Sequence, residues 1–266
     1  MRGFVVILLY LAAIAATVHA VGRGGGRTAL REPAIYFAGA AWLAHAFWLA
    51  ASLRPLSLLD MSLADSASLL GLVIGAGGLF ALLSRRYRVV AAIVLGLAAL
   101  LAAGTGSMHE SPGIVGPRWP LATHVVLAMG SAGMFAIAAV LVILLAVQDG
   151  QLRRKRPANW LASLPPVESL EQAMFTILGT GMAALTMAIL AGLLFVTDLF
   201  QQHLVHKAIL ALAAWLIFAV LLIGRWRFGW RGRKAKAYAL TGFVVLALAY
   251  FGSKFVLEIL LGRHWG

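Results

Sequence analysis

Residues 224–235 read GRWRFGWRGRKA, a basic and aromatic segment that separates two apolar runs, 207–224 and 237–261. Two further polar islands lie nearby, LPPVESLEQAMF at 164–175 and ALAYFGSKFVLEILLGRHWG at 247–266. A helix of about 20 apolar residues crosses the roughly 30 Å hydrocarbon core of a bilayer. This part of the sequence therefore predicts membrane-crossing helices joined by short polar connections.

The composition extends this prediction to the whole chain. Hydrophobic residues make up 62% of the 266 positions and charged residues 12%, whereas soluble domains are about half apolar and about a quarter charged. We predict an all-α polytopic bundle that forms a single transmembrane domain over 1–266. The fourth apolar run is short, so six or seven spans remain an alternative in which that run is re-entrant. The eight runs cover 2–21, 34–53, 66–84, 89–104, 121–147, 171–196, 207–224 and 237–261.

The formal net charge of +13 reflects topology rather than a nucleic-acid surface. Sixteen of the 22 Lys and Arg residues lie in the connections after the first, third, fifth and seventh runs, and basic residues concentrate in cytoplasmic loops. This pattern predicts that both termini lie on the outer side of the membrane. We interpret 2–21 as a span rather than a cleaved signal peptide, because cleavage would leave Arg23, Arg27 and Arg31 outside.

The chain contains no cysteine, which excludes disulfides, thiolate metal ligands and thiol redox chemistry. Histidines are then the candidate metal ligands. His124 lies near the start of the run 121–147, where an imidazole whose second nitrogen is held by a carbonyl or water can ligate haem iron. His264 lies near the outer end of the last run. Two histidines from helices distant in sequence suit bis-imidazole ligation, although spacing alone does not bring them together.

Other polar residues support further interpretations. Arg118 or Lys207 could meet haem propionates, and Trp119 could border the haem edge. His203 and His206 lie three residues apart, so they share a helix face and could form half of a zinc site with His109 or Glu110. His45 lies within an apolar run, where an ionisable residue is a functional candidate; the alternative is a neutral histidine bonded to a neighbouring helix. The sequence GLVIGAGG at 71–78 favours close helix packing.

The order of the polar islands resembles a known family. LPPVESLE precedes a span containing GTGMAALTMAILAGLLF, which is followed by GRWRFGWRGRKA and then by TGFVVLALAYFGSKFV. This order is similar to that of the CcsA/HemX-like cytochrome c assembly superfamily, most closely its YpjD-like inner-membrane branch. The resemblance covers a CcsA-like module over 119–266 and is strongest over 160–266.

The resemblance implies a multi-pass protein of the bacterial inner membrane, whose outer side is periplasmic. Such a protein binds haem at its outer face and supplies it for attachment to apocytochrome c. It also implies two outer histidine ligands, and His124 and His264 match their positions. Two departures stand out. The tryptophan-rich WWD segment of cytochrome c synthases is absent, and Gly224 stands where the family has a histidine near the cytoplasmic end of a helix.

We therefore expect a haem-binding or haem-passing protein of cytochrome c assembly that is not an enzyme on its own. Expected partners are haem, the lipid bilayer and proteins of cytochrome c maturation or another membrane complex. The alternative is a haem-free transporter or accessory subunit that retains the fold, in which His45, Asp198 and Lys207 line a path.

Overall fold

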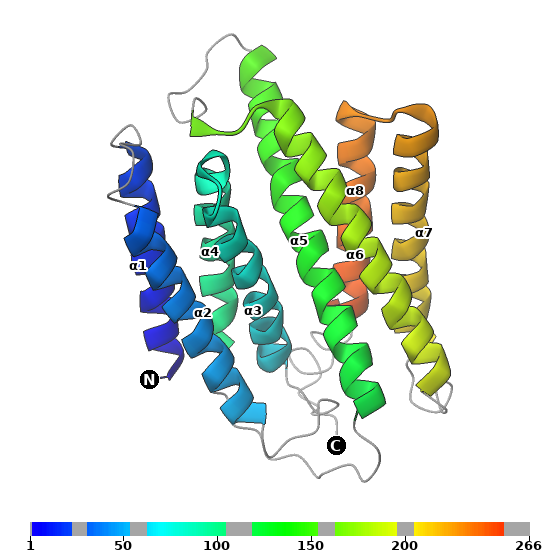
Figure 1. Cartoon of the computed structure of the whole chain (residues 1–266). Coiled ribbons are helices and arrows are strands. Elements are labelled where there is room, and N and C mark those ends of the chain that lie inside the picture. The colour runs from blue at the N-terminus through cyan, green and yellow to red at the C-terminus, as the bar shows by residue number, and fades with distance from the viewer. Residues whose placement is uncertain are drawn as a thin grey trace. The chain divides into compact units, whose positions relative to one another are not determined.

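The computed structural model describes residues 2–22, 31–53, 63–104, 119–153, 163–195 and 205–252. Within these ranges the chain is helical apart from short turns, and it has no strand (Figure 1). The predicted all-α fold is confirmed. The α-helices are α1 (Arg2–Gly22), α2 (Arg31–Leu53), α3 (Leu63–Leu82), α4 (Arg88–Leu101), α5 (Trp119–Arg153), α6 (Val167–Phe195), α7 (Val205–Phe228) and α8 (Gly232–Ala247).

Seven of these helices are long and apolar enough to cross a membrane, which confirms a polytopic bundle. The exception is α4, whose 14 residues extend about 21 Å at 1.5 Å per residue. Short 3-10 turns at Arg85–Tyr87 and Ala102–Gly104 flank it. This helix corresponds to the fourth apolar run, which the sequence distinguishes as short. The orientation of the bundle in the membrane stays a prediction.

The helices form two compact units. Unit 1 comprises Met1–Pro55, Ala64–His109 and Ile143–Gln172, and unit 2 comprises Leu56–Leu63, Glu110–Val142 and Ala173–Gly266. Both α5 and α6 contribute residues to each unit. A single transmembrane domain over 1–266 therefore stays a prediction.

Unit 1 is closely packed around α3. A Cβ atom at Gly71 would lie 2.8 Å from the Cβ of Leu101, and one at Gly78 would lie 2.8 Å from a side-chain carbon of Leu95. These glycines therefore let α4 approach the backbone of α3. The packing role predicted for 71–78 is confirmed.

The LPPVES island begins α6 and holds the turn between α3 and α4. The backbone N–H groups of Ser169 and Leu170 donate to the carbonyl of Pro166, at 2.9 and 3.1 Å. Arg86 donates to the hydroxyl of Ser169 at 3.0 Å, and the Tyr87 hydroxyl donates to the Ser169 carbonyl at 3.2 Å. One serine thus links the α3–α4 turn to the start of α6 within unit 1.

The core of unit 2 is a stacked pair of phenylalanines. The rings of Phe135 on α5 and Phe218 on α7 lie 3.9 Å apart between centroids and are nearly parallel, at 2°. Glycines of the other two helices make room for them. A Cβ atom at Gly181 on α6 would lie 3.3 Å from the Phe135 ring, and one at Gly242 on α8 would lie 2.8 Å from the Phe218 ring. Four helices thus meet at one aromatic pair.

Two glycines with left-handed backbone conformation shape the turn between α7 and α8. Gly229 has φ 64° and Gly232 has φ 58°, values that glycine adopts without the steric cost paid by other residues. The N–H groups of Gly229 and Trp230 donate to the carbonyls of Arg225 and Gly224, each at 3.1 Å. The GRWRFGWRGRKA island is therefore a tight turn between two membrane-length helices.

Candidate functional site

His124 joins α5 to α6 within unit 2. It is the sixth residue of α5, and its ring is half-buried. Its Nδ1 atom lies 2.7 Å from the carbonyl oxygen of Ala188 on α6, a residue whose side chain is buried. The two residues are 64 positions apart in sequence. A backbone carbonyl of α6 thus holds the imidazole of His124.

The site on α6 consists of a carbonyl and a glycine. A Cβ atom at Gly192 would lie 3.1 Å from Cε1 and 3.2 Å from Nδ1 of His124, which is closer than an ordinary van der Waals contact. Ala188 and Gly192 are four residues apart and therefore lie on the same helix face. The Nδ1–Cε1 edge of the ring rests on this face because Gly192 has no side chain.

The hydrogen bond determines the tautomer of a neutral His124. A carbonyl oxygen only accepts hydrogen bonds, so Nδ1 carries the proton and Nε2 keeps its lone pair. Metal-ligating histidines commonly donate their other ring N–H to a backbone carbonyl in this way. Of the two partners considered for the second nitrogen, a carbonyl or a water, the structure shows a carbonyl, and this arrangement fits the chemistry of a haem-ligating histidine. Its ligation of iron stays a prediction.

Sequence reasoning missed Ala188 and Gly192. A carbonyl that accepts a hydrogen bond has no side-chain signal, because every residue carries one. Gly192 is visible in the sequence only as a glycine near the end of an apolar span. That it faces an imidazole becomes evident only once the helices are packed.

The other predicted haem-site residues are only partly described. Lys207 lies near the start of α7 and is half-buried. His206 and Trp119 lie in the helices α7 and α5, but their side chains are outside the described part. His264, His203 and Arg118, together with the alternative zinc ligands His109 and Glu110, lie outside the described residues. No group of three His, Asp or Glu residues suited to a metal occurs in the part of the chain that the structure describes.

His45 belongs to a separate buried cluster in unit 1. Its Nδ1 lies 3.3 Å from the hydroxyl of Tyr10 on α1, and its Nε2 lies 2.9 Å from the hydroxyl of Ser68 on α3. The side chains of all three residues are fully buried. Hydroxyls both donate and accept, so either neutral tautomer is satisfied. The structure therefore agrees with a neutral histidine bonded to neighbouring helices.

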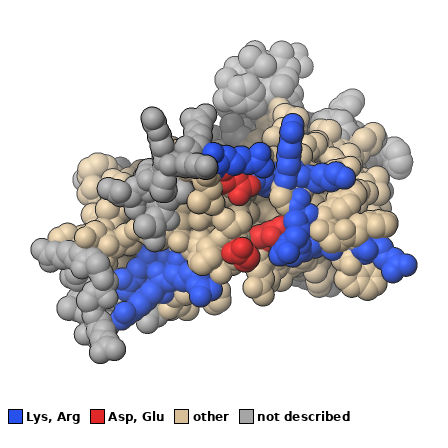
Figure 2. Space-filling model, turned by 90° about the horizontal axis from the view of Figure 1, so that it is seen from above, with Lys and Arg blue, Asp and Glu red and all other residues tan. Residues whose placement is uncertain are grey.

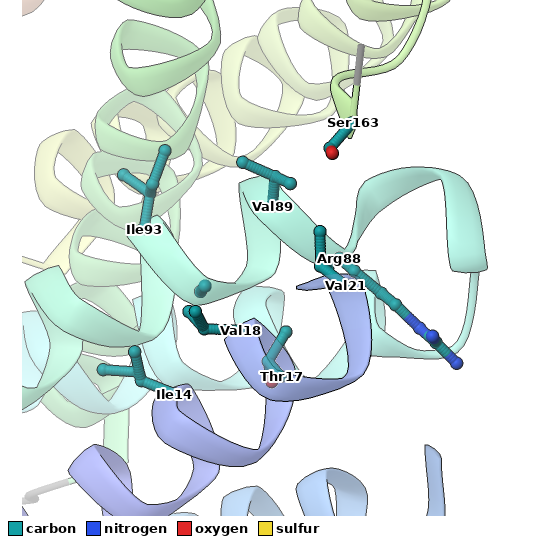
Figure 3. Close-up of a pocket in the computed structure, with 9 residues that line it drawn as sticks. Ile14, Thr17, Val18, Val21, Arg88, Val89, Ile93 and Ser163 are labelled. Carbon is teal, nitrogen blue, oxygen red and sulfur yellow. The ribbon is translucent and has the colours of Figure 1, made fainter. Parts of the chain in front are cut away.

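A groove between α1 and α4 has a volume of about 380 Å³. In Figure 3 the side chain of Arg88 extends away from Val89 and Ile93, so its guanidinium does not point toward them. The lining contains no histidine, which makes the groove unsuitable for holding haem iron through imidazole. Its residues are Ile14, Thr17, Val18, Val21, Arg88, Val89, Ala92, Ile93 and Ser163.

Comparison with known proteins identifies the family. The sequence profile of "Cytochrome C assembly protein" matches residues 36–261. The chain belongs to this family. The resemblance drawn from the polar islands is confirmed, and the match begins before the module expected over 119–266.

The matches to curated relatives cover about half of this chain or less, and the chain spans about half the length of the first relatives that it matches. "Inner membrane protein YpjD" of Escherichia coli K12 is 37% identical over 137 residues, which are 52% of this chain and 52% of that protein. An uncharacterized 28.8 kDa protein of Azospirillum brasilense is 31% identical over 141 residues, with the same two shares. "Cytochrome c biogenesis protein CcsA" of Gloeothece citriformis is 34% identical over 98 residues, 36% of this chain and 30% of that protein. No solved structure matches the chain.

Gly224 is the position at which the family resemblance implies a histidine in α7. In this protein its space is filled by an indole, because a Cβ atom at Gly224 would overlap the ring of Trp230. The Trp230 ring lies 5.2 Å from the ring of Tyr238, between centroids, and 5.9 Å from Nζ of Lys234. The α7–α8 turn thus offers no space for an added imidazole at this position.

Proposed function

We propose that this protein binds haem at the outer face of the bacterial inner membrane and passes it on in cytochrome c assembly. The observation that carries the proposal is the hydrogen bond from His124 Nδ1 to the Ala188 carbonyl. It leaves Nε2 as the basic nitrogen of a ring already fixed in orientation. Membership of the cytochrome c assembly family makes haem the ligand that this nitrogen is expected to meet.

His124 and His264 are the proposed axial ligands. Haem bound at this site would supply an iron atom that accepts imidazole nitrogens, which these two histidines would provide. The role of Ala188 and Gly192 is to hold the first imidazole, and lower-ranked contacts come from Lys207, Arg118 and Trp119. His203 and His206 remain secondary candidates.

The basic residues of the chain support the side of the membrane on which His124 lies, and the name of a relative supports the identity of the membrane. The described basic residue at the end of α5, Arg153, is 29 positions from His124, about 43 Å along a continuous helix. Basic connections lie on the cytoplasmic side, so His124 lies on the outer side. The name of the Escherichia coli relative supports the inner membrane.

The partners are haem, the bilayer and proteins of cytochrome c maturation. The absence of the WWD segment supports a carrier or accessory role without synthase activity. A transport function that runs through His45 has no support from the cluster around it, because both ring nitrogens are bonded and the side chain is fully buried.

The test is an absorption spectrum of the full chain purified after haem-replete expression. We expect a Soret band that weakens in His124→Ala and in His264→Ala. His19→Ala is a matched control, because His19 is an exposed histidine in the last turn of α1. A wild-type protein without bound haem, or a Soret band unchanged in both ligand variants, would overturn the proposal.

A further inference from the structure

The turn between α7 and α8 combines exposed aromatic and basic side chains. Trp226 is 88% exposed and Phe228 is 70% exposed, and both lie in the last turns of a membrane-length helix. Figure 2 looks onto the end of the helices at which α7 is joined to α8 and shows Lys and Arg side chains at its surface. The exposed basic residues of the turn are Arg227, Arg231, Arg233 and Lys234.

The charge of this turn is not balanced within unit 2. Among the residues of unit 2 that the structure describes there is no Asp or Glu. Neither the Arg227 side chain nor the Arg233 side chain makes a hydrogen bond or ion pair with a described residue. As far as the described part of the chain shows, these two guanidinium groups can bind an external anion.

Contacts within unit 2 hold the α7–α8 turn in place. Arg225 donates to the carbonyl of Trp230 at 3.4 Å, and its guanidinium lies 4.6 Å from the centroid of the Phe175 ring. The Trp230 ring packs on Gly224, so contacts with α6 and within the turn itself hold the turn in its conformation. Tryptophan is enriched at the headgroup level of membranes, which places Trp226 and the adjacent cations beside lipid phosphates.

We propose that the α7–α8 turn is a binding surface for anionic phospholipids of the cytoplasmic leaflet, with Arg227 and Arg233 bound to headgroup phosphate and Trp226 and Phe228 inserted among the lipids. Clusters of basic residues immediately next to a membrane helix bind anionic headgroups. Arginine suits this role because its planar fork bonds phosphate through two donors at once. The positive-inside rule explains why the charge of the turn is positive. The proposed surface goes beyond this rule, because the turn binds anionic lipids in preference to others.

The double variant R227Q/R233Q tests the proposal, with R85Q/R153Q as the matched control. The control also removes two exposed arginines from helix ends expected on the cytoplasmic side, but in unit 1. Each protein is placed in nanodiscs of phosphatidylglycerol and phosphatidylcholine, and native mass spectrometry measures the lipids that remain bound. Each cation that binds an anionic headgroup contributes about fivefold to the affinity, so R227Q/R233Q is expected to lose on the order of 30-fold if both arginines bind headgroups in this turn.

The expected result is preferential retention of phosphatidylglycerol by the wild type and by R85Q/R153Q, with loss of this preference in R227Q/R233Q. Added salt should reduce the preference, because mobile ions screen exposed charges. Helical content and gel filtration of the variants verify folding. Equal retention of the two lipids by the wild type, or the same preference in both double variants, would contradict the proposal.

Discussion

His124 on α5 donates a hydrogen bond from Nδ1 to the Ala188 carbonyl on α6, with 2.7 Å between the two atoms. The bond connects a candidate ligand to a helix that carries no ligand itself. The orientation of Nε2 therefore depends on the packing of α5 against α6. Changes on α6 should alter haem binding without touching a histidine.

Gly192→Leu should weaken haem binding, because even a Cβ atom at this position lies 3.1 Å from the His124 ring. Loss of the group that orients a metal-binding histidine typically costs 10- to 100-fold in affinity, and we expect a reduction of about that size. Haem titration followed at the Soret band measures it. Gly179→Leu is the control on the same helix, since nothing lies within 4 Å of its Cβ position. Equal affinities of the two variants would contradict the role of Gly192.

The buried cluster of unit 1 should contribute to stability. Tyr10→Phe removes one hydrogen-bond partner of His45, and an unsatisfied buried polar group costs about 1–3 kcal/mol. Thermal unfolding in detergent should show a lower midpoint for Tyr10→Phe than for Tyr36→Phe, whose side chain is 70% exposed. Both variants should keep the wild-type haem spectrum. A normal midpoint combined with lost haem would instead assign the cluster to function.

The aromatic core of unit 2 should be destabilised by a side chain at Gly242 of α8. Gly242→Leu forces atoms into the Phe218 ring, and overpacking of this kind costs about 1–3 kcal/mol. Denaturant unfolding should show this loss. Gly130→Leu, at a position with nothing within 4 Å of its Cβ, should unfold like the wild type; if it is equally destabilised, the loss reflects leucine in the membrane helix rather than the contact.

The predicted topology can be tested with single cysteines, because the chain has none of its own. Thr123→Cys lies next to His124, and Arg227→Cys lies in the α7–α8 turn; both native side chains are exposed. A membrane-impermeant thiol reagent added to the outer side should label Thr123→Cys and leave Arg227→Cys unlabelled. The reverse pattern would place His124 on the cytoplasmic side.

Local patterns in the sequence were sufficient to predict the helices. Apolar length alone indicates a membrane helix, so α1 to α7 match the first seven predicted runs, and α4 is short because its run is short. The eighth run, 237–261, matches α8 as far as the structure describes it. The split into two units was not predictable. It depends on which helix surfaces meet, as when Phe135 stacks on Phe218, and the spacing of residues along the chain does not determine this.

The candidate site was predicted only in part, for a related reason. His124 was identifiable because it lies in the first turns of an apolar run and matches a histidine position of the family. Its partner is the backbone of Ala188, which carries no signal in the sequence. Likewise, the position of His45 in an apolar run was evident, whereas its partners Tyr10 and Ser68 lie on two other helices and became known only from packing.

The most direct test of the central claim is the coordination state of haem in the wild-type protein and in His124→Ala, measured by electron paramagnetic resonance. Two axial imidazoles should give a six-coordinate, low-spin iron in the wild type. His124→Ala should lose this signal, and added imidazole should restore it by replacing the missing nitrogen. A low-spin signal that persists unchanged in His124→Ala would contradict the assignment of His124 as an axial ligand.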